Sequence, residues 1–366
     1  MSSATSVTFA VRRDDWSQGR FERAPLAPLA AGQVRLRLDR FALTSNNITY
    51  AAAGDLLDYW GFFPAEPGWG HIPVMGFADV SESAHPEITV GERVFGFFPM
   101  TSHLVVAAEP AGAGQFVDGA AHRRQHALAY RQYSRIAHDP VYEPGREDQI
   151  LLLRGLFLTA FLVDAFLSDH DGFGAERYVV GSASSKTGIA LAWLLARESR
   201  GRVVGVTAPR NREFVQGLGC YDQVIGYDEV KTLPAQVPTT FIDHSGDGDF
   251  VAALHHHLGD RLGHHCVVGA THWNAAPRPA ELPGPEPAFF FAPGEIAKRV
   301  QAWGADGFQQ RLAGSWRQFC AWTDGWLRIV RGAGPAELTR VYHELLEGRA
   351  RPAEGHVLSL QQREAG

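Results

Sequence analysis

The sequence contains little cysteine, no surplus of positive charge and no unbroken apolar run, and each shortage excludes a class of protein. Among 366 residues the cysteines are Cys220, Cys266 and Cys320, and they lie far apart. Cysteines at such spacing build neither a disulfide framework nor a four-cysteine zinc lobe, and they suit a reducing compartment. We therefore expect a cytoplasmic protein without structural zinc.

Charge and hydropathy limit the partners. The formal net charge is −6 at pH 7, so no basic field exists to hold nucleic acid or an anionic membrane. The longest apolar stretch, residues 150–167, is interrupted by Arg154 and Asp164, whereas a bilayer span needs about 20 apolar residues. The opening stretch MSSATSVTFAVRRDDW lacks the apolar core of a signal peptide. We expect a small-molecule substrate as the partner, with no nucleic acid and no membrane.

The pattern of residues 1–148 predicts a β-rich substrate domain. The segment Val34–Leu38 alternates apolar and charged side chains, which is the period-two pattern of a half-buried strand. In Gly91–Met100, GERVFGFFPM, a tight turn leads into an apolar strand. Short strands punctuated by glycine and proline are typical of a compact β domain.

From residue 149 the pattern changes to alternating strands and helices. Strands are predicted at 177–180, 202–206, 223–225, 239–243 and 266–268, and helices at 187–198, 210–218 and 250–258. Strands separated by helices require crossover connections and hence a parallel sheet. Residues 149–287 are therefore predicted to form a doubly wound α/β domain.

The remaining segment, residues 288–366, is predicted to be helical and to close the substrate cleft. Helices are expected at 295–303, 307–329 and 335–346. Aromatic side chains at helical spacing are more often packing residues than a cofactor site. We assign that packing role to the tryptophans of this segment, which are Trp303, Trp316, Trp322 and Trp326.

The stretch YVVGSASSKTGIALAWLL, Tyr178 to Leu195, combines an apolar strand, a turn of small residues and an alanine-rich helix. A dinucleotide needs such an element, because the turn lets the backbone approach the pyrophosphate and the helix N-terminus attracts its charge. Lys186 either pairs with a phosphate or is a solvated surface lysine. The predicted phosphate-binding residues are Ser182, Ser184, Ser185, Lys186, Thr187 and Gly188.

Taken together, these segments resemble the zinc-independent medium-chain dehydrogenases/reductases, the group of quinone oxidoreductases and enoyl reductases. Gly201–Val230 is similar to the family's second strand, helix and third strand, Phe241–Gly246 to its fourth strand, and Val267–Gly269 to its fifth. GERVFGFFPM and Leu158–Phe161 are similar to family segments upstream. The resemblance is closest to a branch without an assigned function. It implies a GroES-like β domain, a Rossmann domain, an active cleft between them, and possible homodimers.

The turn departs from the family pattern. Three glycines are usual there, and when the chain is aligned on Gly188 the first two fall on Ser182 and Ser185. Serine adds bulk but also supplies hydroxyl donors. Two interpretations follow: the turn still binds a dinucleotide, or the Rossmann scaffold has lost it.

The end of the second strand favours NADPH over NADH. The stretch from Val206 to Asn211, VTAPRN, contains no carboxylate for a ribose 2′-hydroxyl, whereas Thr207 and Arg210 suit a 2′-phosphate. The alternative for Arg210 is a surface charge at a helix start, where cations are mildly disfavoured. The resemblance adds Tyr227 near the adenosine phosphate. Further cofactor contacts are expected at the ends of the fourth and fifth strands, from His244, Gly269 and Thr271.

A catalytic metal is not expected. Zinc-dependent relatives use a cysteine and a histidine–glutamate pair in the first domain, and the corresponding stretches here, 43–47 and 73–77, contain none of these residues. The runs His255–His257 and His264–His265 suggest metal affinity. Neighbouring helix residues point in different directions, however. We interpret these side chains as surface histidines.

The resemblance implies few acid–base groups, because hydride transfer to an electrophilic carbon needs only one or two donors for the developing anion. Tyr50, Asn47 and Thr159 are the predicted catalytic residues. The alternative for Tyr50 is packing in an aromatic cluster with neighbours such as Tyr59. The predicted substrate-binding residues are Asn46, Tyr133, His272 and Trp273.

The leading interpretation is an NADPH-dependent, metal-independent reductase of an activated alkene or carbonyl, of the enone, quinone or enoyl thioester type. A rival is a Rossmann scaffold without redox activity that binds a ligand or acts as a lyase or isomerase. The sequence does not identify the substrate.

Overall fold

The computed structural model describes residues 5–269 and 281–361. The chain divides into one unit formed by Met1–Leu152 with Arg328–Gly366 and a second unit formed by Leu153–Leu327. The C-terminal segment expected at 288–366 is thus split between the two units. Its last part returns to the first unit because it supplies strands to that unit's sheet.

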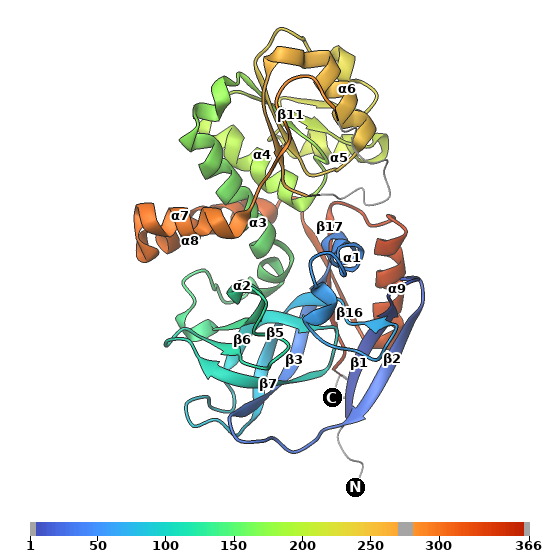
Figure 1. Ribbon diagram of the computed structural model, residues 1–366, viewed down its shortest axis with the longest axis vertical. Coiled ribbons are helices and arrows are strands. Elements are labelled where there is room, and N and C mark those ends of the chain that lie inside the picture. The colour runs from blue at the N-terminus through green and yellow to red at the C-terminus, as the bar shows by residue number, and fades with distance from the viewer. Residues whose placement is uncertain (1–4, 270–280, 362–366) are drawn as a thin grey trace. The chain divides into compact units, whose positions relative to one another are not determined.

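The first unit is predominantly β-structure, with short helices between its strands (Figure 1). Its strands are β1 (Thr5–Arg12), β2 (Gly19–Pro25), β3 (Gln33–Leu43), β4 (Trp69–Gly70), β5 (Pro73–Ser83), β6 (Arg93–Pro99), β7 (His103–Pro110), β8 (Gln115–Asp118), β9 (Gln132–Arg135), β16 (Arg328–Ala333) and β17 (Glu354–Ser359). Its helices are α1 (Ser45–Ala52), α2 (Leu128–Arg131) and α9 (Pro335–Leu346), with 3₁₀ turns η1 (Tyr59–Gly61) and η2 (Ile136–His138).

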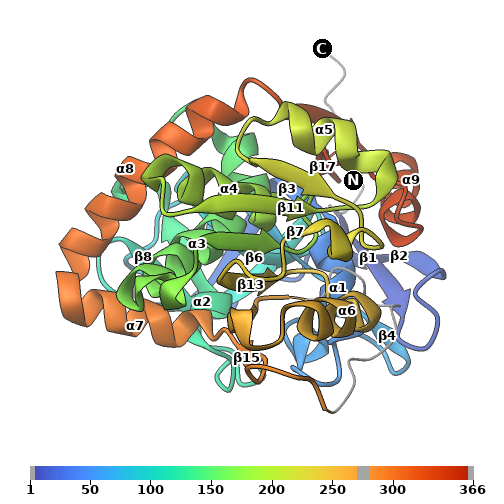
Figure 2. The same ribbon diagram turned by 90° about the horizontal axis from the view of Figure 1, so that it is seen from above.

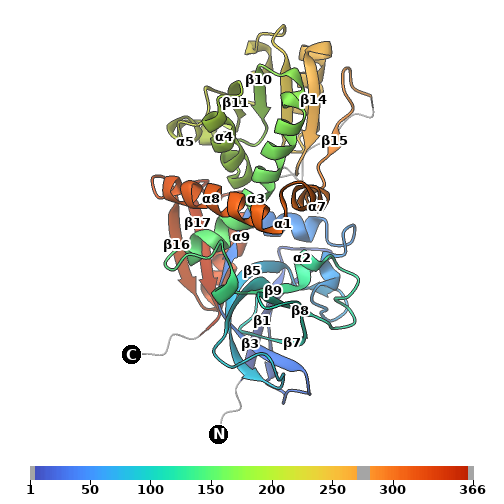
Figure 3. The same cartoon turned by 90° about the vertical axis from the view of Figure 1, so that its left-hand side faces the viewer.

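The larger sheet of this unit closes on itself. Its order is β16-β17-β3-β5-β6-β9-β8-β7, and β3 also pairs with β7. The strands from β3 round to β7 therefore form a barrel, and β17 and β16 extend it side by side (Figure 3). Alternating residues of β3, including Val34, Leu36 and Leu38, are buried in the core. The predicted β-rich first domain is confirmed, although its sheet also contains two C-terminal strands.

The second unit alternates strands and helices around a six-stranded sheet. Its strands are β10 (Arg177–Val180), β11 (Arg202–Val206), β12 (Gln223–Ile225), β13 (Thr239–Asp243), β14 (Leu262–Val267) and β15 (Ala288–Phe289). Its helices are α4 (Lys186–Glu198), α5 (Arg212–Gly217), α6 (Gly248–Leu258), α7 (Ala292–Trp303) and α8 (Ala305–Thr323), with 3₁₀ turns η3 (Asp171–Gly174), η4 (Pro209–Asn211), η5 (Val230–Thr232) and η6 (Gly259–Arg261).

All the strand pairs of this sheet are parallel, in the order β12-β11-β10-β13-β14-β15. Helices α4 and α5 lie on one face and α6 on the other (Figure 2). Strands such as Arg177–Val180 are buried at every residue, as expected for strands covered on both faces. The predicted doubly wound α/β domain is confirmed.

The apolar helix α3 (Glu147–Asp169) is long and hydrophobic enough to cross a membrane by length and composition alone. The core helix of a soluble protein passes the same test. Within the second unit, Phe157 stacks on Phe319 with ring centroids 4.8 Å apart and meets Trp316 at 5.5 Å. These contacts give α3 the packing of a core helix.

The C-terminal helices differ in one place from their prediction. A helix was expected to run from 307 to 329, but α8 ends at Thr323 and Arg328 begins β16. The reason is tertiary, because β16 pairs in parallel with β17 across a distant part of the sequence. The tryptophans expected to pack do so: Trp316 is fully buried, and Trp322 lies 6.2 Å from Trp193 of α4 between ring centroids.

Candidate functional site

The strand order of the second unit creates a point where the chain changes direction. From β10 it proceeds outward through β11 to β12, and then returns to β13 on the other side of β10. In open parallel sheets, ligands bind beside the carboxyl ends of the strands at such a switch point. Gly181 follows β10 there, and Thr207 and His244 follow β11 and β13.

The turn after β10 keeps a glycine-like backbone at one of its serines. Ser182, aligned with the first missing glycine, has φ of 53° in the left-handed region, which glycine adopts most easily. A Cβ atom at Gly188 would lie 3.0 Å from both the carbonyl oxygen of Ser182 and Oγ of Ser185. The serine at 182 therefore keeps a glycine-like conformation, and Gly188 is needed for close packing.

The same turn leads into the N-terminus of α4. Ser185 is the N-cap residue, and its Oγ accepts a hydrogen bond from the backbone NH of Gly188 at 3.1 Å. Lys186 and Thr187 are the first residues of the helix, where backbone NH groups have no intrahelical acceptor. Positive charge from these NH groups and the helix dipole favours an anion at this end.

Neighbouring strands hold the turn in place. The NH of Ala183 donates to the carbonyl of Val206 at 2.8 Å, and the hydroxyl of Tyr221 donates to the carbonyl of Ala183 at 2.9 Å. Nδ2 of Asn211 donates to Oγ of Ser184 at 3.0 Å. The sequence prediction missed Tyr221 and Asn211, although Asn211 lies beside Arg210 in the segment it used to choose the nucleotide.

The residues predicted to contact the adenosine end gather after β11 and β12. Thr207 is buried, and its NH donates to the carbonyl of Ile225 at 3.0 Å. Arg210 is exposed on the η4 turn. Burial raises the pKa of Tyr227 well above its usual value, and contacts with Ser182 act in the opposite direction. The structure thus brings Tyr227 to the serine turn, and its contact with the cofactor stays a prediction.

His244 is the most unusual residue of this edge. Its side chain is 3% exposed, and neither ring nitrogen has a hydrogen-bond partner among the described residues. Burial lowers its pKa to about 4, although Asp243 and the backbone of Gly181 and Ile242 act in the opposite direction. The ring is therefore neutral near neutral pH. A buried polar group without a partner costs on the order of 1–3 kcal/mol.

The end of β14 belongs to the same edge. The NH groups of Val268 and Gly269 donate to the carbonyl of Asp243 at 2.9 and 3.3 Å. Gly269 therefore lies beside the turn after β13, and its contact with the cofactor stays a prediction. Thr271, His272 and Trp273, predicted to follow it, lie outside the described residues.

In the first unit, Tyr50 lies within an aromatic cluster. Its ring centroid is 4.7 Å from that of Tyr59 and 6.3 Å from that of Phe97. Burial raises the pKa of Tyr50 well above its usual value, and a contact with Asn46 opposes the shift. The hydroxyl is therefore protonated near neutral pH. Both earlier interpretations of Tyr50 stay open, because packing and proton donation are compatible.

Asn47 and Thr159 use their polar groups within the fold. Oδ1 of Asn47 accepts from the NH of Thr44 at 2.7 Å and Nδ2 donates to the carbonyl of Pro73 at 2.9 Å. These bonds cap α1 and join it to β5. The hydroxyl of Thr159 donates to the carbonyl of Gly155 in its own helix at 3.1 Å. The structure gives Asn47 a structural role, and catalysis by either residue stays a prediction.

Tyr133 requires a correction. It was predicted to contact substrate, but its side chain is fully buried in the barrel. Its hydroxyl donates to the carbonyl of Phe97 at 3.1 Å, and its ring stacks on Phe116 with centroids 5.4 Å apart. The position on β9 directs the ring into the core because alternate strand residues face inward.

The interpretation of the histidine runs as surface residues is wrong for two of them. His255 and His265 are fully buried, and Nε2 of His255 lies 2.8 Å from Nδ1 of His265. His256 is exposed as predicted. The run on α6 was misread because successive helix residues are rotated by about 100°, so His255 is buried while His256 is exposed.

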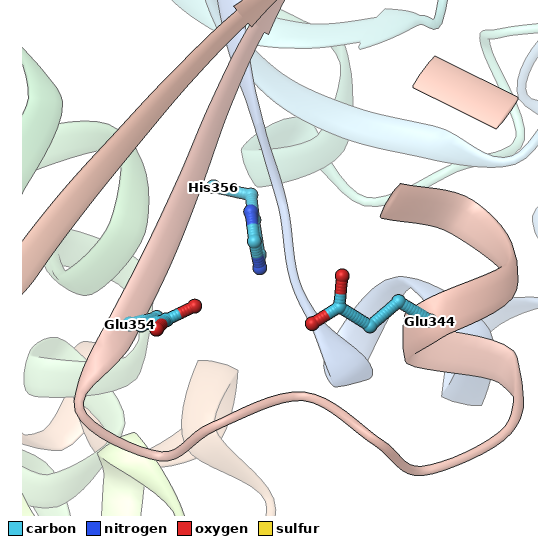
Figure 4. Close-up of side chains that lie close together, drawn as sticks. All are labelled: Glu344, Glu354 and His356. Atoms are coloured by element: carbon cyan, nitrogen blue, oxygen red, sulfur yellow. The ribbon is translucent and has the colours of Figure 1, made fainter. Parts of the chain in front are cut away.

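Among the described residues, one group has the composition of a metal site: Glu344 of α9 with Glu354 and His356 of β17 (Figure 4). Their ligand atoms lie within 4.8 Å of one another. Guanidinium groups already neutralise the carboxylates, because Arg340 pairs with Glu344, and Arg328 and Arg351 pair with Glu354. A cation would compete with these ion pairs, so the cluster is well explained as a charge network.

Solved structures share this fold along almost the whole chain. CurA from Vibrio vulnificus in complex with NADPH is 16% identical, with a TM-score of 0.61 and coverage of 98% of this chain and 100% of that chain. The YhdH oxidoreductase from Salmonella enterica in complex with NADP is 14% identical, with a TM-score of 0.55 and coverage of 97% and 100%. The CurK enoyl reductase is 15% identical, with a TM-score of 0.51 and coverage of 97% and 99%. These matches confirm the fold expected from the resemblance to quinone oxidoreductases and enoyl reductases.

No curated protein sequence matches the chain. A family model does match, over residues 41–351, and its description is "Protein of unknown function (DUF2855)". That range includes all the strands from β5 to β16 and the whole switch-point edge. The chain therefore belongs to the DUF2855 family.

Proposed function

We propose that this protein is an NADPH-dependent, metal-independent reductase of an activated alkene or carbonyl, of the enone, quinone or enoyl thioester type. The observation that carries the proposal is the buried imidazole of His244 at the switch point, which has no hydrogen-bond partner among the described residues. A polar group in that state indicates a ligand at this edge of the sheet. Parallel sheets of this topology bind nucleotides there.

The residues at this edge suit the parts of a dinucleotide. The serine turn and the N-terminus of α4 would hold the pyrophosphate, with Lys186 adding positive charge. Thr207 and Arg210 would hold the 2′-phosphate, and the absence of a carboxylate between Val206 and Asn211 favours NADPH over NADH. His244 and Gly269 would face the remainder of the molecule. When bound, NADPH supplies the hydride.

The fold comparisons support the same class of reaction. The CurA structure contains NADPH, the YhdH structure contains NADP, and CurK is an enoyl reductase. Those properties belong to proteins of 14–16% identity. The proposal takes from them the cofactor and the general chemistry, and the enone, quinone or enoyl thioester class is our own extension.

In the proposed reaction, Tyr50 donates the proton. Reduction of a conjugated alkene or a carbonyl leaves an anion that needs a hydrogen-bond donor and then a proton. Because burial holds the pKa of Tyr50 above its usual value, the phenol keeps its proton near neutral pH. Asn46, one helical turn earlier, contacts this hydroxyl and would orient it towards the substrate, which Asn46 is itself predicted to bind. The proposed substrate is a small molecule, and the proposed location is the cytoplasm, which suits the three buried free cysteines.

Calorimetric titration of the full-length protein with NADPH and with NADH tests the cofactor proposal. We expect NADPH to bind at least about tenfold more tightly than NADH, since a 2′-phosphate held by an arginine adds a charge-assisted contact. Equal affinities, or no binding of either nucleotide, would contradict the proposal. Turnover is then measured as NADPH oxidation with a panel of enones, quinones and enoyl thioesters. Tight NADPH binding without turnover on any class would favour the non-redox interpretation.

A further inference from the structure

Three buried polar side chains lie next to one another in the second unit: Asp243 at the end of β13, His265 of β14 and His255 of α6. Nε2 of His265 lies 3.8 Å from Oδ2 of Asp243, an ion-pair distance. Nδ1 of His265 lies 2.8 Å from Nε2 of His255, and Nδ1 of His255 lies 2.8 Å from the carbonyl oxygen of Pro283. Asp243 is 2% exposed, and both imidazoles are fully buried.

The number of protons shared by these three side chains follows from the groups at the two ends of the series, which are the Pro283 carbonyl and the Asp243 carboxyl group. The Pro283 carbonyl only accepts, so Nδ1 of His255 carries a proton. One further proton lies between the two rings. Nε2 of His265 makes no hydrogen bond among the described residues, but a lone pair there would face Oδ2 of Asp243 at 3.8 Å, which favours a third proton at this nitrogen. Two neutral imidazoles carry only two ring protons between them. The third proton is therefore either on a ring, which makes one histidine an imidazolium beside a carboxylate, or on Asp243, which makes it a carboxylic acid beside two neutral rings.

The hydrogen bonds around Asp243 favour its ionised carboxylate over the protonated carboxylic acid. Its Oδ1 accepts from the NH of Ser245 at 2.7 Å, the hydroxyl of Ser245 at 2.6 Å and the NH of Gly246 at 3.1 Å. Burial acts to raise the pKa of Asp243, but the nearby His265 and the hydrogen bonds from Ser245 outweigh it and the net shift is downward. A carboxylate that accepts several NH and OH bonds is stabilised in its charged form.

In the part of the chain that the structure describes, we find no other group that supplies the balancing charge. Among the described residues, Asp243 has no ion pair with lysine or arginine. Burial lowers the pKa of both His244 and His264 to about 4, so neither is charged near neutral pH. The remaining titratable groups that interact with Asp243 are Cys266 and Tyr227, and both are neutral. Asp247, at the N-cap of α6, interacts with Tyr227 and adds no positive charge.

We propose that Asp243, His265 and His255 form a charge-balanced, proton-sharing chain that positions the dinucleotide-binding edge. Asp243 connects three strand ends: its carbonyl accepts from Val268 and Gly269 after β14, and a Cβ atom at Gly181 after β10 would lie 3.1 Å from its Oδ1. His244 is the next residue in sequence. These are positioning residues, and their effect on cofactor binding rests on the proposed function.

The proton count is measured without any cofactor, by long-range ¹H–¹⁵N NMR of protein labelled in its histidines. His255→Gln and His265→Gln assign the signals. We expect three of the four ring nitrogens of His255 and His265 to be protonated in the unsubstituted protein near neutral pH. In Asp243→Asn the count falls to two, because the new amide donates to His265. Two protonated nitrogens in the unsubstituted protein would overturn the proposal.

The positioning role is tested by NADPH titration of variants. His265→Leu leaves Asp243 as an unbalanced buried charge and is expected to weaken binding by about tenfold or more. Asp243→Asn in the same background removes that charge and is expected to recover part of the loss. His256→Gln is the matched control, since His256 is exposed on the same helix, and it should leave the affinity unchanged.

Wild-type affinity in His265→Leu, or no recovery in the double variant, would overturn the positioning role. If His265→Leu does not fold, the NMR count in Asp243→Asn still decides the proposal. If the unsubstituted protein binds no NADPH, the proposed function fails while the proton count is still measured.

Discussion

Nδ2 of Asn211 donates a hydrogen bond to Oγ of Ser184 over 3.0 Å and so joins the turn after β11 to the turn after β10. The two turns are predicted to hold opposite ends of the adenosine part of NADPH. Asn211→Ala removes this connection. Because a single hydrogen bond contributes about 0.5–1.5 kcal/mol net, we expect NADPH affinity to fall about three- to tenfold.

The loss should be equal for NADH, because the bond positions the turn and does not contact the 2′-phosphate. Isothermal calorimetry with both nucleotides measures it. Gln216→Ala, an exposed position on α5, is the control. An Asn211→Ala variant with unchanged affinity would show that the turn is held without this bond.

Arg210 is expected to determine the choice of nucleotide. It is exposed on the η4 turn after β11, where a guanidinium group can bind a phosphate with two hydrogen bonds. Arg210→Ala should weaken NADPH binding by about tenfold or more and leave NADH binding unchanged. Arg202→Ala, an exposed arginine at the opposite end of β11, controls for the loss of charge. Equal losses for both nucleotides would assign Arg210 to the fold instead.

Ser182 is expected to tolerate glycine and reject a β-branched residue. Its φ of 53° lies in the left-handed region, which costs a residue with a side chain about 1–2 kcal/mol and a β-branched one more. Ser182→Val should therefore lower the free energy of unfolding by about 2 kcal/mol. Ser182→Gly should leave it within about 1 kcal/mol. Urea unfolding followed by fluorescence measures both, and a stable valine variant would contradict the left-handed conformation.

Asp164 is expected to make stability depend on pH. Burial raises its pKa to about 6, outweighing the attraction of Arg200, whose Nη1 lies 3.3 Å away. The pKa of Asp164 is higher in the folded than in the unfolded protein, so ionising this carboxyl group lowers the free energy of unfolding. This penalty is absent below about pH 4, grows as the pH rises, and is complete above about pH 6.

Asp164→Asn should therefore raise the free energy of unfolding by about 1–3 kcal/mol near neutral pH and have little effect near pH 4. Denaturant unfolding at both pH values tests the sign. Asp260→Asn, at an exposed position, is the control. A destabilised Asp164→Asn variant near neutral pH would mean that the Arg200 ion pair outweighs burial.

Tyr50 distinguishes catalysis from packing. Tyr50→Phe keeps the ring that packs on Tyr59 and Phe97 but removes the hydroxyl. If the hydroxyl donates the proton, kcat should fall by about 100-fold with little change in KM, as for the loss of a general acid. Tyr59→Phe, the neighbouring ring, is the matched control. An unchanged kcat would assign Tyr50 to packing alone.

The second unit was largely predictable because its signals are local. Arg177–Val180, Arg202–Val206 and Thr239–Asp243 were predicted with the bounds that the structure shows. Each is a short apolar run that ends at a turn residue, and each is covered on both faces, so burial and strand propensity agree. The helix from Pro335 to Leu346 was also predicted residue for residue.

Elements that depend on distant pairing were not predictable. Residues 328 and 329 were predicted to end a helix that begins at 307, but Arg328 pairs with Glu354 and begins a strand. Tyr133 was predicted to contact substrate, but the closure of the barrel buried it. In both cases the deciding contact is far away in sequence, where local pattern carries no information.

Some features of the candidate site were predictable from the sequence, and others depend on the tertiary structure. The sequence by itself determined the turn from Gly181 to Gly188, the lack of a carboxylate after β11 and the order of strands and helices, because each depends on neighbouring residues. Only the tertiary structure decided that His244 is buried without a partner and that His255 and His265 meet Asp243 inside the fold. The physical reason is burial: a polar side chain acquires its charge, its partners and its chemical use from what surrounds it after folding.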